Sequence, residues 1–101
     1  MKKHTFYLYT AILGKEKETI KKKGLKPQEG ETYIHLSGTK EEAMDALRAE
    51  YDFNTIVSND VFIVKVAVDM ESLIIQPTDY CGIIFDYFYF IKPEDLEILD
   101  V

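Results

Sequence analysis

Apolar and aromatic stretches alternate with charged, helix-prone stretches in the first half of the chain, and apolar stretches dominate the second half. Six of them have the length and the β-branched or aromatic content of strands. They cover residues 5–12, 32–36, 61–68, 73–76, 83–91 and 96–99. Residues 61–68 are almost continuously apolar, which predicts a strand inside the sheet rather than at its edge.

Two charged stretches between the first three of these strands are predicted to be helices. The first covers residues 15–23 and is followed by Gly24, a residue that suits the left-handed conformation after a helix. The second covers residues 40–51 and begins with a capping box, in which Thr39 caps a backbone N–H and Glu42 reaches back. Helices early and strands late predict an α+β domain with a largely antiparallel sheet.

Composition limits the class of protein. A chain of 101 residues, 47% hydrophobic and 30% charged, predicts one globular domain over residues 1–101. The net charge of −6 and the single arginine, Arg48, disfavour a nucleic-acid partner. One cysteine, Cys81, cannot form an internal disulfide, and no apolar run is long enough for a membrane span or a signal peptide. We therefore expect a cytoplasmic protein.

The segment around His35 is the strongest candidate for chemistry. His35 lies between Ile34 and Leu36 in the sequence, and its side chain is on the face of the predicted strand opposite to theirs. Ser37 and then Gly38 follow in the sequence. The alternative is that His35 is an ordinary half-buried strand residue, and strand alternation alone does not decide between the two. No metal-ligand spacing, phosphate-binding glycine loop or nucleophile elbow is present, so no metal or serine triad is expected.

The aromatic strand near the C-terminus offers a second candidate surface. Phe85, Tyr87 and Tyr89 share one face of the strand, and Asp86 falls on the other. Such a stripe is typical of sheet packing, and it would stack against a flat ring if it lined a cleft. The pattern leaves both interpretations open.

Three blocks, in order, resemble the ADP-ribosyltransferase superfamily. The first is the strand end at residues 8–10, followed by a helix and the turn at residues 23–27. The second is the histidine–apolar–serine strand at residues 33–37 with its capped helix, and both blocks are similar to those of RNA 2′-phosphotransferases. The third, residues 73–94, resembles the closing segment of a small bacterial family of unknown function with the same type of fold.

This resemblance implies an ADP-ribosyltransferase-like split antiparallel sheet with two helices. It implies a cleft that binds NAD or an ADP-ribose-type nucleotide and transfers or hydrolyses it. The ligand-binding residues it implies, together with the aromatic face described above, are Tyr9, Thr10, His35, Ser37, Tyr87 and Tyr89. For catalysis we expect His35 to orient the ribose and a carboxylate, Asp86 or Asp79, to support the cationic transition state.

The chain also departs from the superfamily. Thr10 stands where the first strand usually ends in histidine, Gln76 stands where a glutamate is usual, and Asp86-Tyr87 replaces a proline–histidine pair. A single arginine cannot supply the phosphate clamps of RNA 2′-phosphotransferases, so that activity is not expected. These departures favour an alternative function, a catalytically degenerate module of the same fold that binds a small ligand or a protein partner.

Overall fold

The computed structural model describes residues 5–27, 33–69, 73–77, 83–87 and 90–100. The strands are β1 (Thr5–Leu13), β2 (Ile34–Ser37), β3 (Val61–Asp69), β4 (Leu73–Pro77), β5 (Ile83–Tyr87) and β6 (Leu96–Asp100). The helices are α1 (Lys17–Lys23), α2 (Lys40–Glu50) and α3 (Phe53–Ser58), with 3₁₀ turns η1 (Gly14–Glu16) and η3 (Pro93–Asp95). The protein is therefore an α+β domain with an antiparallel sheet.

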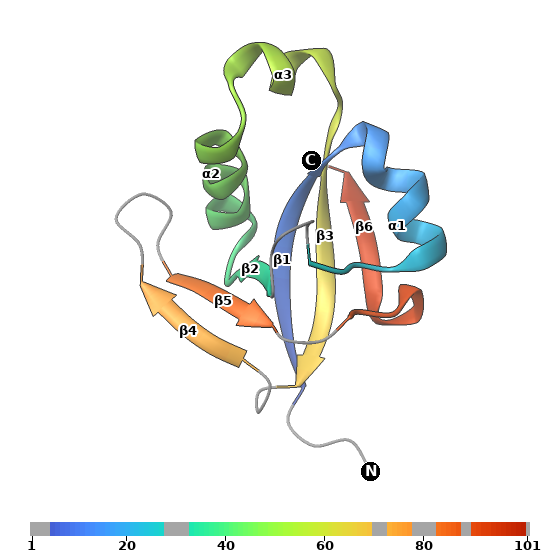
Figure 1. The fold of residues 1–101 in the computed structure, drawn as a ribbon, viewed down its shortest axis with the longest axis vertical. Helices are drawn as coiled ribbons and strands as arrows, with labels where there is room; N and C mark the ends of the chain where they lie inside the picture. Colours follow the sequence, from blue (N-terminus) through green and yellow to red (C-terminus); the bar gives the residue numbers. More distant parts are fainter. Residues whose placement is uncertain (1–4, 28–32, 70–72, 78–82, 88–89, 101) are drawn as a thin grey trace.

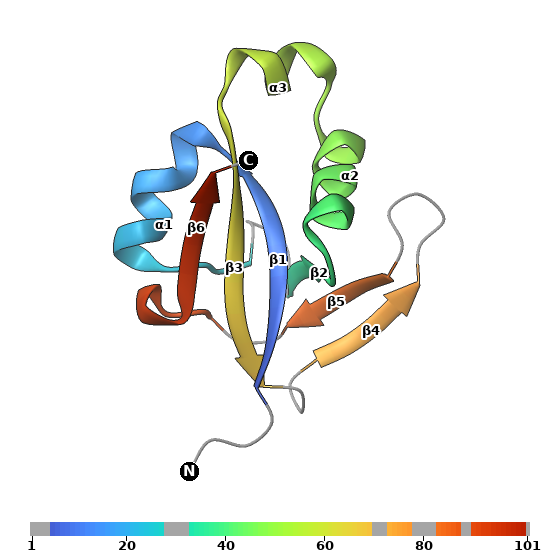
Figure 2. The same cartoon turned by 180° about the vertical axis from the view of Figure 1, so that it is seen from behind.

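The sheet consists of two halves that meet at a narrow junction. Its strand order is β4-β5-β2-β1-β3-β6, and every neighbouring pair is antiparallel. β1 pairs with β3 along its whole length, whereas its described register with β2 consists of Tyr9 opposite Ser37. Figures 1 and 2 show β1, β3 and β6 running side by side, with β2, β5 and β4 inclined to them. The two halves diverge beyond Tyr9.

The core fills one face of the long β1–β3 ladder. Val64 and Val66 of β3 are fully buried, as the continuous apolar pattern of this strand predicted. Ile20 of α1 and Leu36 of β2 belong to the same cluster of buried side chains. α2 packs against β1 and contributes buried residues outside this cluster, among them Leu47. The apolar anchors therefore hold both helices against the sheet.

Most predicted elements are confirmed, with shifts of one or two residues at their ends. The capping box is confirmed, because the Glu42 backbone N–H donates to Thr39 Oγ1 at 3.1 Å. Gly24 ends α1 with a φ of 82°, as its position predicted. Two predictions need correction. The chain has a third α-helix, α3, and the strand expected over residues 83–91 is β5 (Ile83–Tyr87), with residues 88 and 89 outside the described part and Phe90 and Ile91 not in the strand.

The chain after α1 forms a fixed strap across the sheet. Leu25 and Ile91 form an isolated antiparallel bridge, with N–H to O distances of 2.8 and 2.7 Å in the two directions. Both side chains are buried in the core cluster. The strap then leads towards β2, so residues 24–27 form one wall of the space where the sheet halves diverge.

Candidate functional site

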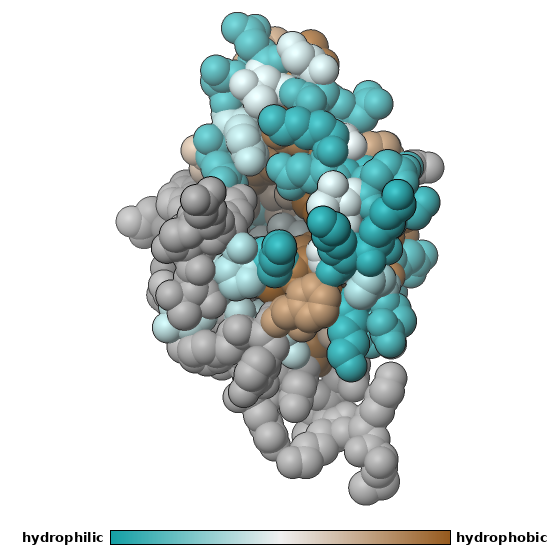
Figure 3. Space-filling model, turned by 45° about the vertical axis from the view of Figure 1, so that its right-hand side comes forward, coloured by the Kyte–Doolittle hydropathy of each residue, from teal (hydrophilic) through white to brown (hydrophobic). Residues whose placement is uncertain are grey.

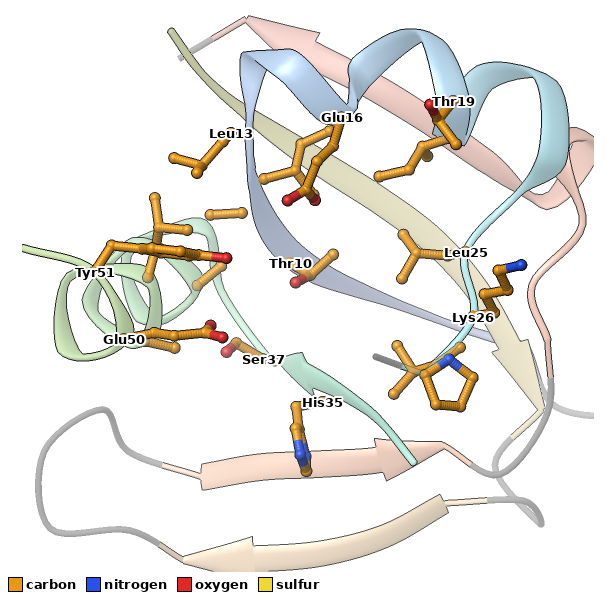
Figure 4. A pocket seen from close by; sticks show the side chains of 18 of the residues that line it. Thr10, Leu13, Glu16, Thr19, Leu25, Lys26, His35, Ser37, Glu50 and Tyr51 are labelled. Carbon is orange, nitrogen blue, oxygen red and sulfur yellow. The ribbon is translucent and has the colours of Figure 1, made fainter. Parts of the chain in front are cut away.

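A cleft of about 890 Å³ opens where β1 and β2 diverge. It is enclosed by the end of β1, the first turn of α1, the strap after Gly24, strand β2 and the inner side of α2. Figure 4 shows these elements surrounding its interior. The volume lies within the 300–1,000 Å³ range that is typical of small-molecule sites.

The position of the cleft follows from the junction of the sheet. Residues 10–13 of β1 all line it, although successive strand side chains point to opposite faces. A pocket on one face would be lined by alternate residues, so a continuous run marks the edge of the strand. This run begins directly after Tyr9, the residue that pairs with β2. The cleft therefore occupies the gap beside β1 that β2 leaves open.

Two hydroxyl groups lie in the interior. Thr10 and Ser37 line the cleft, and Figure 4 shows both side chains directed into it. Ser37 is only 3% exposed, and its hydroxyl borders the open space of the cleft, because no fully buried side-chain oxygen or nitrogen of the described residues lacks a hydrogen-bond partner. The Ser37 hydroxyl can therefore donate to, or accept from, a ligand in the cleft.

Acidic and aromatic groups gather at one end of the cleft. Glu16, Glu50 and Tyr51 line it, and their oxygen atoms point towards the interior in Figure 4. Burial raises the pKa of Glu16; Lys15 opposes this rise and Glu50 adds to it. Burial also raises the pKa of Tyr51, and the charges of Glu50 and Glu16 raise it further. The three groups thus lie within electrostatic range of one another.

Lysine side chains also reach the cleft. Lys26, on the strap, is exposed and lies across the interior from Glu50 in Figure 4, and Lys15 lines the cleft beside Glu16. Hydrophilic side chains cover much of the helices on the face seen in Figure 3, with smaller areas of hydrophobic surface between them. The cleft therefore has one lysine next to the carboxylates, Lys15, and a second, Lys26, across the interior from Glu50.

His35 lies at the rim of the cleft rather than at its centre. The side chain is exposed, and in Figure 4 its ring points away from the interior, towards the side of β5. In the sheet register its partner is Asp86 of β5, which makes the two predicted catalytic residues neighbours across adjacent strands. The Asp86 side chain and the whole of Asp79 lie outside what the structure describes.

The structure brings together three of the residues predicted to bind the ligand. Thr10, His35 and Ser37 line the same cleft, whereas Tyr9 and Tyr87, two of the three tyrosines of which one or more was expected there, do not line it. Tyr9 is paired on both sides, with Ser37 and with Lys65, so it lies where the sheet is closed. The remaining predicted tyrosine, at position 89, lies outside the described residues.

Tyr87 packs in the sheet, which was one of the two interpretations left open for the aromatic residues of this strand. Its register partner is Ile34, a buried core residue, and its ring packs against the core cluster. A cross-strand pair lies on the same face of the sheet, so Tyr87 follows Ile34 into the interior. The tyrosines that do line the cleft are Tyr33 and Tyr51, which the sequence did not single out.

A local signal could have indicated part of the acidic end. Tyr51 lies four residues after the buried Leu47, a spacing that places two residues on the same side of a helix. Nothing in the local sequence brings Glu16 close to Glu50, because the two residues belong to different elements joined only by the fold.

Comparisons with protein-family models, with curated proteins and with solved structures find no match to this chain. Among the described residues, no group of three or more histidine, cysteine, aspartate or glutamate side chains is placed to hold a metal ion. None of the described helices has the length and hydrophobicity needed to cross a bilayer.

Proposed function

We propose that the cleft binds a nucleotide of the NAD or ADP-ribose type and cleaves or transfers it at the bond to ribose. The observation that carries this proposal is the grouping of the Thr10 and Ser37 hydroxyls with the carboxylates of Glu16 and Glu50 in one cleft beside the edge of β1. Hydroxyls suit the ribose of such a ligand, and carboxylates suit a positive charge that develops during the reaction. The resemblance of the three sequence blocks to ADP-ribosyltransferases agrees with this class of ligand.

The charges of the cleft favour one orientation of the nucleotide. Glu16 and Glu50 repel a pyrophosphate, which would lie towards Lys26 on the opposite side. The positively charged nicotinamide ring of NAD would then lie towards the carboxylates. Lysine holds a phosphate as a point charge rather than through the bidentate contacts of arginine.

The proposed reaction breaks the bond between the ribose C1′ and the nicotinamide nitrogen. Nicotinamide leaves as a neutral molecule with the bonding electron pair, and the positive charge passes to the ribose. A carboxylate at the acidic end stabilises this charge, and water or an acceptor hydroxyl adds to C1′ and loses a proton. Asp86, the register partner of His35, remains a further candidate for the carboxylate.

A second candidate function is ligand or protein binding without catalysis. The specific observation in its favour is the position of Arg48, which is exposed on α2 and ion-paired with Asp45 at 3.1 Å. This arginine does not line the cleft, so phosphate recognition rests on lysine and backbone groups. The rim position of His35 also favours this alternative. The same features argue against RNA 2′-phosphotransferase activity.

Calorimetry with NAD, ADP-ribose and nicotinamide tests the proposal on the wild type, Ser37→Ala and His35→Ala. Ser58→Ala is the control, because Ser58 is exposed on α3 and does not line the cleft. We expect Ser37→Ala to weaken nucleotide binding about threefold to tenfold through the lost hydrogen bond, and the control to leave it unchanged. Chromatography of the NAD mixture for released nicotinamide separates the two candidate functions.

The possible results have distinct meanings. Heat with NAD accompanied by nicotinamide release supports the enzyme. Heat with ADP-ribose or NAD without release supports the binding module. No heat with any of the three ligands overturns the assignment to NAD and ADP-ribose.

A further inference from the structure

Glu16 and Glu50 come from different elements and point into the same end of the cleft (Figure 4). Glu16 ends the 3₁₀ turn before α1, where the helix dipole favours an anion. Glu50 is the last residue of α2, where the helix dipole disfavours one. Within the described part of the chain, neither carboxylate takes part in an ion pair. Lys15, the sequence neighbour of Glu16, offsets part of their negative charge, and a cationic ligand group would offset more of it.

A second observation points to a ligand at this place. Ser37 is 3% exposed as a residue, and its hydroxyl faces the same interior without a described hydrogen bond to another residue. A polar ligand group in the cleft would give this hydroxyl a hydrogen-bond partner. The aromatic ring of Tyr51 borders the same end, and aromatic faces attract cations.

We infer that Glu16, Glu50 and Tyr51 bind a positively charged organic group of the ligand, with Ser37 beside it as a hydrogen-bonding group. The inference deepens the proposed function on which it rests, because the pyridinium ring of NAD is such a group. It assigns the support of positive charge to Glu16 and Glu50. Burial is the main cause of the raised pKa values of Glu16 and Tyr51, and the charge of Glu50 adds to both.

The direct test compares two small ligands that differ by one methyl group and one charge. Nicotinamide is neutral, whereas nicotinamide methylated on its ring nitrogen is a cation. Their affinities are measured by NMR titration at neutral pH on the wild type, Glu16→Gln and Glu50→Gln. The control is Glu41→Gln, which removes the same charge from the exposed side of α2, away from the cleft.

We expect the wild type to bind the cation about tenfold more tightly than the neutral ring, as one partly solvated pair of opposite charges with an aromatic contact would give. Each cleft variant should lose about threefold to tenfold in affinity for the cation and little for the neutral ring. The Glu41→Gln protein should behave as the wild type does. Thermal melts of all four proteins confirm that they are folded.

Equal affinities of the wild type for the two rings would overturn the inference, as would an equal loss in Glu41→Gln. Failure here is distinguishable from failure of the proposed function. ADP-ribose lacks the pyridinium ring, so its binding with no preference for the cation would leave the nucleotide site standing and remove the charge assignment. Preference for the cation without any nucleotide binding would leave the charge assignment standing and remove the nucleotide site.

Discussion

Glu16 has a partly buried carboxyl group beside Glu50, and burial raises its pKa above the ordinary value of 4.5. At a pH between the ordinary pKa and the raised pKa of Glu16, the folded protein holds a proton on this carboxyl group that the unfolded chain has released. Stability therefore falls as the pH rises through this window. At neutral pH the ionised Glu16 carboxylate therefore lowers the free energy of unfolding slightly.

Glu16→Gln should remove the destabilisation caused by the ionised Glu16 carboxylate. We expect the variant to match the wild type below the ordinary pKa of Glu16 and to be more stable than the wild type at neutral pH, by less than about 1 kcal/mol because the carboxyl is partly solvated. Urea unfolding at acidic and neutral pH measures the difference. A variant that is less stable than the wild type at neutral pH would contradict the assignment of a raised pKa.

The role of a residue could be predicted from the sequence where its partners are close to it in the chain. Thr39 and Glu42 lie three residues apart, and their contact depends only on the helix that they begin. Gly24 was predictable for the same reason, because the end of α1 requires a left-handed residue. Glu16 was not, since its importance comes from Glu50, a residue 34 positions away that only the fold brings near.

At the scale of elements, Gly24 fixes the strap that walls the cleft. Its φ of 82° is unfavourable for any residue with a side chain, and an added Cβ would meet the Ile91 carbonyl oxygen and the Phe90 ring. The bridge between Leu25 and Ile91 depends on this close approach. Gly24 therefore allows α1 to end and allows the strap to approach Ile91 of the core closely.

Gly24→Ala should lower the free energy of unfolding by about 2 kcal/mol, from backbone strain and displacement of the bridge. Lys23→Ala, at the exposed residue just before it, is the control and should change stability little. Denaturant unfolding of the two variants gives the comparison. Equal stabilities would show that the strap does not depend on this glycine.

Strands and helices with a buried face were predictable, and α3 was not. Two of its three large apolar residues, Phe53 and Val57, are 77% and 65% exposed, and six residues are too few to show a helical apolar repeat in the sequence. The available signal was Asp52, whose carboxylate accepts from the Thr55 N–H at 2.7 Å as a helix cap. Ile91 was expected in the same strand as Ile83–Tyr87, but it pairs instead with Leu25 of the strap.

At the scale of the whole molecule, the cleft results from an incomplete pairing. β3 covers one edge of β1 over nine residues, whereas the described register with β2 is one residue pair. The hydrophobic pattern predicts each strand but contains no information on how far two strands run together. The sequence could therefore suggest Thr10, His35 and Ser37 as neighbours, but not that the cleft begins where Tyr9 ends the pairing.

The central claim is that this gap beside β1 is the ligand site, and amide NMR mapping with ADP-ribose tests it most directly. We predict that the largest shift changes fall on residues 10–13, Ser37 and residues 50–51, which line the cleft. Tyr7 and Lys65, which contact each other away from the cleft, should change little. Changes concentrated around Tyr7 and Lys65, or none at saturating ligand, would contradict the account.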